Sequence, residues 1–400
     1  MVLGLLGQLF LRAFTKKRVE ADVNCSLFFH SLNPRTEFST LTSRPGSGWF
    51  AVHPGSPMEQ TVTDLRPLRE VWNAYVESHP RATQYHRYEW LEVIRAAFGH
   101  EFFPLVARND GEIRGVLPLV LVRSWLFGRR LVSLPFVNYG GVLADAEGDE
   151  RLLWQGAEDL ARKSGAAHLE ARHLRPHPFA TERRQHKATM ILHLEHSIDG
   201  QWSAFNAKLR NQIRKAERSG LSARSAGPEE LPRFYQVFAR CMRDLGTPVY
   251  GRRFFAEILR AFPASSRIFL VESGSKAVAA AIALSHRETL EVPWAGSLRE
   301  YRSHCANNLL YWKMISQAIH EGFHHFDFGR STPGDGPYRF KEQWGAQPTL
   351  LHWEYWLPAP GKIPDLSPKN DKFSAAIQIW KRLPLPVTNW LGPALVRGIP

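Results

Sequence analysis

From residue 68 onward, apolar and polar positions follow the periods of helices and strands. Apolar side chains recur at helical spacing in 68–78 and 88–98, so we expect two amphipathic helices there. Strand-like runs follow at 102–108 and 113–123, and Asn109-Asp-Gly between them supplies the positive φ angles of a hairpin turn. The chain is therefore expected to begin its ordered part with helices and an antiparallel hairpin.

The pattern then continues to the middle of the chain. A strand is expected over 131–143, and Asn138-Tyr-Gly-Gly interrupts it. Such an interruption is typical of a place where the backbone must come close to another group. A helix at 150–163 and strands at 168–174 and 189–195 follow.

The second half repeats this order of elements. Helices are expected at 202–219, 228–244, 252–262 and 307–321, and strands at 268–272, 277–285, 289–294, 326–329 and 350–356. Each half thus contains helices, an antiparallel meander, a helix and two strands. The predicted fold class is mixed α/β, because the antiparallel strands are too numerous for a doubly wound nucleotide-binding fold.

A chain of 400 residues suits two domains of about 150 residues each, with tails. We expect four segments, namely 1–57, 58–197, 198–357 and 358–400. The first lacks helix or strand periodicity. This segment is either a disordered or weakly amphipathic, membrane-touching extension, or it is not translated because translation begins at Met58. We favour the start at Met58. The last is a Pro-rich tail with one short helix around 375–380.

The net charge of +13 favours anionic partners such as phosphorylated precursors, nucleic acid or a membrane surface, although solubility alone is an alternative. Three separated cysteines without a CxxC motif imply no disulfide framework and suit a reducing cytosol. No run of about 18 apolar residues spans a bilayer, and the first positive charges follow the initial apolar run, unlike a signal peptide. We expect a cytoplasmic monomer, with peripheral contact at the inner face of the membrane left open.

The densest basic pattern lies in the expected helix 202–219. Phe205, Leu209 and Ile213 lie four apart and form an apolar stripe, and Arg210 and Arg214 follow the same spacing one position on. A solvated basic helix is the commoner outcome of such a run. Guanidinium groups beside a core nevertheless suit bidentate phosphate binding, so we predict that both arginines bind an anion.

A second pattern surrounds the turn-forming residues 331–337. Asp327 precedes them at the end of a strand, where it could orient Arg330 or a substrate amine. Lys341 follows them and is flanked by aromatic residues, which can lower a lysine pKa or let the ammonium face developing negative charge. The alternative is a lysine whose stem covers the aromatic rings while its head stays in water.

Two groups of histidines invite a metal hypothesis: His168, His173 and His177, and His320, His324 and His325. The first group spans a strand and a loop, and Gly322 interrupts the second, with no carboxylate to complete it. Zinc needs converging ligands. We therefore expect structural or surface histidines and no metal.

Three ordered motifs resemble FemAB-type peptidyltransferases and BioF2-like acyltransferases. They are Lys208-Leu-Arg-Asn-Gln-Ile-Arg-Lys-Ala-Glu-Arg-Ser-Gly-Leu221, Asn308-Leu-Leu-Tyr-Trp, and Phe326-Asp-Phe-Gly-Arg with Tyr338-Arg-Phe-Lys-Glu-Gln-Trp-Gly345. The resemblance covers about 60–357 and is closest to the subgroup found with exosortase and PEP-CTERM exopolysaccharide systems. It implies tandem domains of the GCN5-related N-acetyltransferase (GNAT) fold.

The resemblance also implies roles for individual residues. The arginine that contacts a substrate phosphate falls on Arg210 or Arg214, the lysine near the acyl-transfer centre falls on Lys341, and a substrate-binding tyrosine is matched by Tyr250. Further substrate contacts are expected from Asn308, Arg330, Tyr338 and Arg339. We predict Lys341 and Asp327 as the catalytic pair.

The implied activity is transfer of an aminoacyl or acyl group to an amine of a phosphorylated cell-envelope precursor, related to peptidoglycan or exopolysaccharide. No cofactor is expected to stay bound, and the donor is aminoacyl-tRNA or acyl-CoA. The acetyl-CoA pyrophosphate loop is not visible before 307–321, and the coiled-coil tRNA arm of some members is missing. The alternatives are a non-catalytic module that binds anionic glycan or lipid-linked intermediates, and plain nucleic-acid binding.

Overall fold

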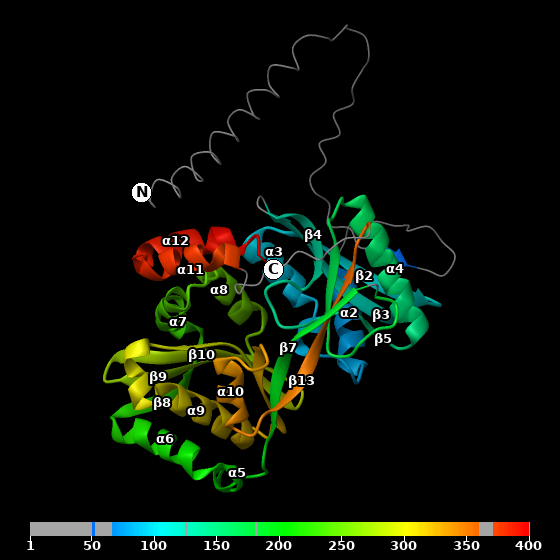
Figure 1. Cartoon of the computed structure of the whole chain (residues 1–400). Helices are drawn as coiled ribbons and strands as arrows, with labels where there is room; N and C mark the ends of the chain where they lie inside the picture. Colours follow the sequence, from blue (N-terminus) through cyan, green and yellow to red (C-terminus); the bar gives the residue numbers. More distant parts are fainter. Residues whose placement is uncertain (1–49, 53–65, 125–126, 181, 360–370, 400) are drawn as a thin grey trace, which may run out of the picture. The chain divides into compact units, whose positions relative to one another are not determined.

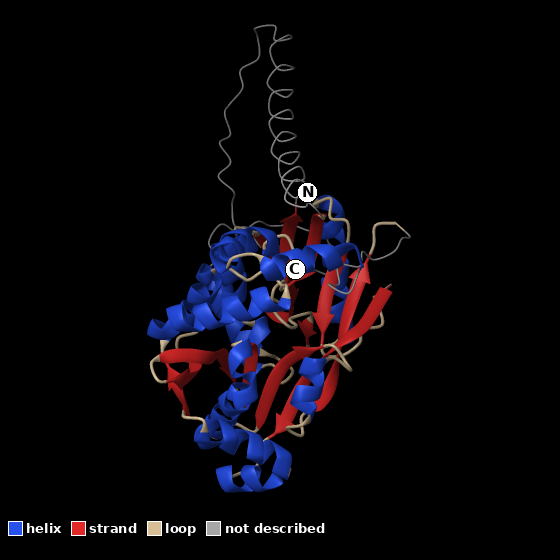
Figure 2. Cartoon of the chain, turned by 60° about the vertical axis from the view of Figure 1, so that its left-hand side comes forward, coloured by secondary structure: helices blue, strands red, loops and turns tan. Residues whose placement is uncertain are grey.

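The computed structural model describes residues 50–52, 66–124, 127–180, 182–359 and 371–399. These residues belong to one compact unit, Ser47–Pro400, which contains a continuous sheet with helices on both faces (Figures 1 and 2). Of the predicted extension 1–57, the structure describes only 50–52, which form a short strand; the rest of that prediction lies outside the described residues.

The helices are α2 (Arg66–Ser78), α3 (Glu89–Phe98), α4 (Glu147–Lys163), α5 (Ile198–Ala204), α6 (Ala207–Arg218), α7 (Leu231–Leu245), α8 (Arg252–Ala261), α9 (Ala306–His320), α10 (Gly336–Glu342), α11 (Asp371–Arg382) and α12 (Leu385–Val396). Short 3₁₀ turns are η1 (Gln84–His86), η2 (Pro228–Glu230) and η3 (Arg299–His304). The strands are β1 (Phe50–Val52), β2 (Glu101–Asn109), β3 (Glu112–Ser124), β4 (Gly128–Ser133), β5 (Leu143–Ala144), β6 (Leu169–His173), β7 (Glu182–His193), β8 (Leu221–Ala226), β9 (Ser266–Ser273), β10 (Lys276–His286), β11 (Thr289–Ser297), β12 (His325–Ser331) and β13 (Gln347–Trp356).

The sheet has the order β1-β2-β3-β4-β6-β13-β7-β12-β11-β10-β9-β8, and β5 pairs with β3. The pairs β1/β2, β4/β6 and β11/β12 are parallel, and the other pairs are antiparallel. Both halves contain a meander, a crossover helix and a strand parallel to the last meander strand: β2-β3-β4-α4-β6 and β9-β10-β11-α9-β12. The predicted mixed, largely antiparallel fold class is confirmed.

The two halves exchange their last strands. β7 follows β6 in the chain but pairs with β12, and β13 follows β12 but pairs with β6. β7 and β13 also pair with each other and cross the middle of the unit (Figure 1). Segments 58–197 and 198–357, predicted as separate domains, are therefore joined through backbone hydrogen bonds of one sheet.

Side-chain packing joins the halves as well. Alternate residues of a strand face opposite sides of the sheet. One side is covered by α2, α3, α7 and α8, which share a single apolar core. In that core Trp90 packs on Phe262 at 5.0 Å between ring centroids, and Phe98 on Phe254 at 5.1 Å. The opposite side is covered by α4 in the first half and by α6 and α9 in the second.

The expected strand 131–143 ends at Ser133 as β4, and only Leu143–Ala144 form the short strand β5. Three other predicted elements differ from the structure. The expected helix 202–219 is two helices, because the Asn206 side chain accepts a hydrogen bond from Leu209 N at 2.9 Å and starts α6 as a new N-cap. The second part of the expected loop 331–337 is helical, since α10 begins at Gly336.

The third difference is the C-terminal segment. It contains α11 and α12 instead of one short helix, and both pack against α7 (Figure 1). Carbonyl groups at its end accept hydrogen bonds from the first half: Arg397 O from His100 Nε2 at 2.9 Å, and Gly398 O from Arg130. This segment is therefore part of the folded unit, and its prolines at 384 and 386 flank the start of α12. Among the helices of the described residues, none combines the length and the apolar character needed to cross a bilayer.

The strand exchange predicts that a fragment of residues 58–197 does not fold alone. Without the second half, β6 loses β13, β7 loses both of its neighbours, and the apolar side of α3 is exposed. We expect aggregation or non-cooperative thermal unfolding of this fragment by circular dichroism. Co-expression with residues 198–400 should give a soluble complex. A monomeric 58–197 fragment with a cooperative melting transition would contradict the prediction.

Candidate functional site

Two carboxyl groups meet at the point where β11 and β12 diverge. Glu291 and Asp327 are register partners on these parallel strands, and their exposed fractions are only 4% and 1%. Pairing of β11 with β12 ends there, because β12 continues along β7 while β11 continues along β10. Carboxyl groups buried side by side need hydrogen-bond donors.

The donors to Glu291 come from the first half of the chain. Tyr85, in η1, donates its hydroxyl hydrogen to Glu291 Oε1 at 2.8 Å. Asn138 Nδ2 donates to the same oxygen at 2.6 Å. A residue of the second half is thus held by two side chains more than 150 positions earlier in the sequence.

Asp327 accepts three hydrogen bonds. Thr189 Oγ1 on β7 donates to Oδ1 at 2.5 Å, and Gly329 N donates to Oδ1 at 2.7 Å. Tyr139 donates its hydroxyl hydrogen to Oδ2 at 3.1 Å. A Cβ at Gly329, where φ is +73°, would lie 3.0 Å from Val292 O, so this close turn requires glycine.

Residues 134–141 form the buried loop that delivers Asn138 and Tyr139. Leu134 and Phe136 have φ angles of 43° and 74°, a conformation that costs such residues about 1 kcal/mol or more. Arg172 holds the loop backbone, because its Nη1 donates to Val137 O at 3.0 Å and its carbonyl accepts from Gly140 N at 3.1 Å. The interruption at Asn138-Tyr-Gly-Gly thus corresponds to a loop that enters the acidic site.

Lys341 lies next to the two carboxyl groups, on α10, with 6% of its surface exposed. Its Nζ donates to Gly329 O at 2.7 Å and to Arg330 O at 3.2 Å. Burial lowers the pKa of Lys341 to about 8, although the Asp327 and Glu291 charges oppose this shift. An ammonium group has three donors, so the two carbonyl groups orient it and leave one N–H.

Burial and mutual repulsion keep a proton on the acidic pair. Burial, and next the charge of Asp327, raise the pKa of Glu291 to about 8. Burial also raises the pKa of Asp327, but hydrogen bonds from Thr189 and Gly329 N oppose that shift. We therefore assign the shared proton to Glu291 near neutral pH.

A second charged group borders this cluster. Arg330 Cζ lies 5.4 Å from the ring centroid of Trp353, and Arg172 Cζ lies 4.3 Å from the same centroid. Burial lowers the pKa of Arg330 to about 10, and its Nη1 is buried without a hydrogen-bond partner among the described residues. Burial raises the pKa of Tyr250, while the positive charges of both arginines oppose that shift. These side chains, from both halves, can accept an anionic group.

The structure therefore brings Asp327, Lys341, Arg330 and Tyr250 into one region. Arg214 is exposed, with Cζ 5.2 Å from the ring of Trp202, and Arg210 is half-buried. Their phosphate-binding role stays a prediction.

The remaining predicted contacts lie on α9 and α10. Asn308 is buried and donates to Gln212 Oε1 at 3.2 Å, which ties α9 to α6. Tyr338 packs partly buried against the second-half core, and Arg339 is exposed. Asn308 thus has a structural partner, while Arg339 remains available to a ligand.

Sequence reasoning missed Glu291, Tyr85 and Tyr139 as site residues. A signal existed for Glu291, because it is the only charged residue in the otherwise apolar and small-residue strand TLEVPWAGS. Tyr85 offers no such local signal. Its role depends on a contact 206 positions away in the sequence.

The start of α9 is the place where the family resemblance implies a cradle for the pyrophosphate of acyl-CoA. Residues 299–308 contain no glycine. Cys305 has a φ of 57°, and its carbonyl accepts from Asn308 N at 2.9 Å, so this amide near the helix start is already used. A glycine-rich cradle is therefore missing at this helix start.

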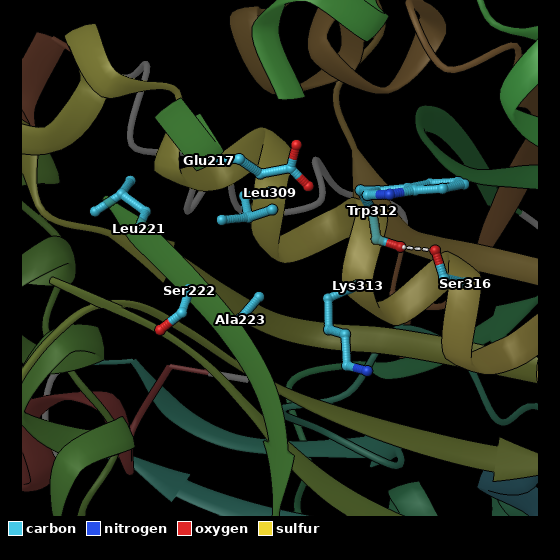
Figure 3. Close-up of a pocket in the computed structure, with 8 residues that line it drawn as sticks. All are labelled: Glu217, Leu221, Ser222, Ala223, Leu309, Trp312, Lys313 and Ser316. Carbon is cyan, nitrogen blue, oxygen red and sulfur yellow. Dashed lines mark hydrogen bonds between the residues drawn. The ribbon is translucent and has the colours of Figure 1, made fainter. Parts of the chain in front are cut away.

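A separate cavity of about 240 Å³ lies among α6, β8 and α9 (Figure 3). Leu221, Leu309 and Trp312 supply apolar lining, and Glu217 and Lys313 supply charges. Glu291, Asp327 and Lys341 are not among the residues that line this cavity, so we assign the cavity no part in their site.

The shared proton predicts a pH-dependent stability that Glu291→Gln removes. Between the usual glutamate pKa of 4.5 and about 8, folded Glu291 holds its proton more tightly than the unfolded chain does. Rising pH therefore destabilises the wild type across this window, by at most about 1.4 kcal/mol per pH unit from this group. The free energy of unfolding of the variant, measured in urea from pH 5 to 8, should fall less steeply than that of the wild type. Parallel pH profiles would contradict the assignment.

Residues 203–342 match the family model described as an acetyltransferase (GNAT) domain. This range includes Glu291, Asp327 and Lys341. A search of curated protein sequences finds no match. Among solved structures, the crystal structure of FemX is similar over 71% of this chain and 95% of that chain, with 15% identity and a TM-score of 0.56.

A conserved protein of unknown function from Bacteroides thetaiotaomicron is similar over 72% of this chain and 96% of that chain, with 13% identity and a TM-score of 0.52. At such identities the likeness shows the fold alone. The second half is thus similar over 203–342 to the acetyltransferase (GNAT) domain family, and the described unit has the fold of FemX.

Proposed function

We propose that this protein is an acyltransferase that joins an activated carboxyl group, aminoacyl or acyl, to an amine of a phosphorylated cell-envelope precursor. The observation that carries the proposal is the buried group of Glu291, Asp327 and Lys341 at the divergence of β11 and β12, inside the segment that matches the acetyltransferase (GNAT) domain. Perturbed titratable groups that converge in this way are typical of catalytic sites.

Lys341 is assigned to the oxyanion. Attack of the amine on the ester or thioester carbonyl places negative charge on the carbonyl oxygen. An ammonium group with a pKa of about 8 is mostly protonated at neutral pH and can donate to that oxygen. Its bonds to Gly329 O and Arg330 O fix its direction before substrate arrives.

Glu291 is assigned to the proton of the attacking amine. A carboxyl group with a pKa of about 8 exchanges protons near neutral pH, as a general base must. The amine nitrogen forms its bond to the carbonyl carbon and loses a proton to the ionised fraction of Glu291. The bond from that carbon to the leaving oxygen or sulfur then breaks, and the leaving atom takes the proton from Glu291. Asp327 accepts three hydrogen bonds, so we assign it to positioning the Gly329 turn and Tyr139, without contact to the reacting atoms.

Arg330 is assigned to the phosphate of the acceptor, with Tyr250 and Arg172 beside it. A buried guanidinium nitrogen without a protein partner suits a charged ligand oxygen. Aminoacyl-tRNA is our preferred donor, because the start of α9 lacks the glycine-rich loop of an acyl-CoA pyrophosphate site and the net charge of +13 suits a polyanion. Exopolysaccharide and peptidoglycan precursors are both candidate acceptors.

Replacement of Lys341 tests the chemical step. Lys341→Met keeps the length of the side chain but removes the charge, and we expect turnover to fall by roughly 10²–10³. The assay follows label from charged tRNA, or from acyl-CoA, onto an acceptor in a cell extract. Lys276→Met, at an exposed lysine on β10, is the matched control. Unchanged turnover in a folded Lys341→Met protein would rule out the assignment. A wild type that binds an anionic glycan but consumes no donor would favour the non-catalytic binding module.

Replacement of Arg330 tests the acceptor anchor. Arg330→Met should raise the KM for a phosphorylated acceptor about tenfold or more, because a charge-assisted hydrogen bond is lost. Arg214→Met should have little effect, since that guanidinium is exposed on Trp202. Arg210→Ala tests the anchor that the basic helix predicts. An effect confined to Arg210 and Arg214 would move the anchor to α6.

A further inference from the structure

Outside the proposed transfer site, two histidines and a glutamate converge in the first half. His173 ends β6, His177 follows in the next loop, and Glu354 lies on β13. Their exposed fractions are 3%, 1% and 0%. One ligand atom from each lies within 4.8 Å of the others. These three side chains are hereafter the His-His-Glu cluster.

The two oxygens of Glu354 have different surroundings. Oε1 accepts from Arg183 Nε at 2.8 Å and from His177 N at 2.9 Å, which fixes the orientation of the carboxylate. Oε2 faces the histidines, at 2.7 Å from His173 Nδ1 and 3.1 Å from His177 Nδ1. Three potential ligand atoms therefore converge from two imidazole rings and one oriented carboxylate.

Residues around the His-His-Glu cluster fix the orientation of its imidazole rings, as the residues that surround the ligands of a metal site do. Glu150 on α4 directs Oε2 toward His177 Nε2, at 3.6 Å, while its Oε1 is bound by Arg175 and Arg81. Such a carboxylate fixes the tautomer of an imidazole whose other nitrogen binds metal. A Cβ on Gly141 would lie 2.0 Å from Cδ2 of His173, so glycine there allows that ring its position.

The distances between the ligand atoms are close to those of a metal site. The separations of 2.7 and 3.1 Å are slightly shorter than the roughly 3.4 Å between ligand atoms of a tetrahedral site with bonds of about 2.1 Å. A small outward shift of the rings would therefore admit an ion.

We propose that the His-His-Glu cluster binds one zinc ion through His173 Nδ1, His177 Nδ1 and Glu354 Oε2. Two imidazoles and a carboxylate form a nitrogen and oxygen ligand set that suits zinc. Glu354 lies on β13, the second-half strand that pairs with β6. His173 is the last residue of β6, and His177 lies in the loop that follows it. The ion is thus a structural link between the halves. The sequence-based expectation of no metal did not include Glu354, since 177 positions separate it from His177.

The charges around the His-His-Glu cluster allow a cation to bind there. Arg81, Arg175 and Arg183 add positive charge, but their side chains are 40%, 44% and 37% exposed, so water and salt screen them. Each of them binds the Oε1 atom of Glu150 or Glu354 and leaves Oε2 for the histidines. The arginines therefore orient the carboxylates from the solvent side.

The test is zinc binding by the full chain. Protein treated with a chelator and then given zinc sulfate alone should retain one zinc per chain by elemental analysis, and zinc should raise its melting temperature. Glu354→Gln, which keeps an oxygen for Arg183, and His177→Gln should each weaken zinc affinity at least about 100-fold in competition with a chromophoric chelator. His168→Gln is the matched control, because His168 is buried near the start of β6 but outside the cluster. It should bind zinc as the wild type does.

Cobalt supplies a readout that needs only the wild type. Co²⁺ held by the three protein ligands and one water should give the visible absorption of a four-coordinate nitrogen and oxygen set, and zinc should remove it stoichiometrically. Wild-type protein that retains no zinc and gives no such spectrum overturns the proposal. Equal zinc affinity of the wild type and both cluster variants overturns it as well. Neither readout depends on transferase activity.

Discussion

Two carboxyl groups that are neighbours across parallel strands, and that water scarcely reaches, cannot both be ionised without a large electrostatic cost. Glu291 and Asp327 are in this position, and the architecture around them supplies what the constraint demands. One proton stays on the pair, a lysine ammonium lies beside it, and hydroxyl, amide and backbone donors approach from four segments of the chain. The same constraint gives the second half a group whose pKa lies near neutrality, as acid–base chemistry requires.

Most of these donors belong to the first half, which explains why the two halves form one unit. Loop 134–141 adopts strained backbone angles in order to reach the site, and β7 carries Thr189 to it. Exchange of β7 and β13 and the shared core beneath α3 and α8 then make the relative position of the halves rigid enough to keep hydrogen bonds of 2.5–3.1 Å. In this account the half that lacks Lys341 and both carboxyl groups is a structural part of the catalytic site.

Periodicity predicted most helices and strands, because apolar spacing is local information. The charges beside aromatic residues around the turn 331–337 led to Lys341 and Asp327, and the family resemblance added Arg330. The strand exchange could not be predicted in this way, since β7 and β13 have ordinary strand patterns and only the partners differ. Contacts such as Tyr85 with Glu291 connect distant segments and leave no local trace. The C-terminal helices were obscured by prolines, which here stand at the start of α12 and within it at Pro393.

The central claim is that Glu291 carries a proton near neutral pH because its burial, and next the charge of Asp327, raise its pKa. Infrared difference spectroscopy of the wild type against Glu291→Gln measures this directly, through the carbonyl stretch of a protonated carboxylic acid. The account predicts that this band is present at pH 7 and disappears with an apparent pKa of about 8. A spectrum in which Glu291 is already ionised at pH 6 would contradict the account.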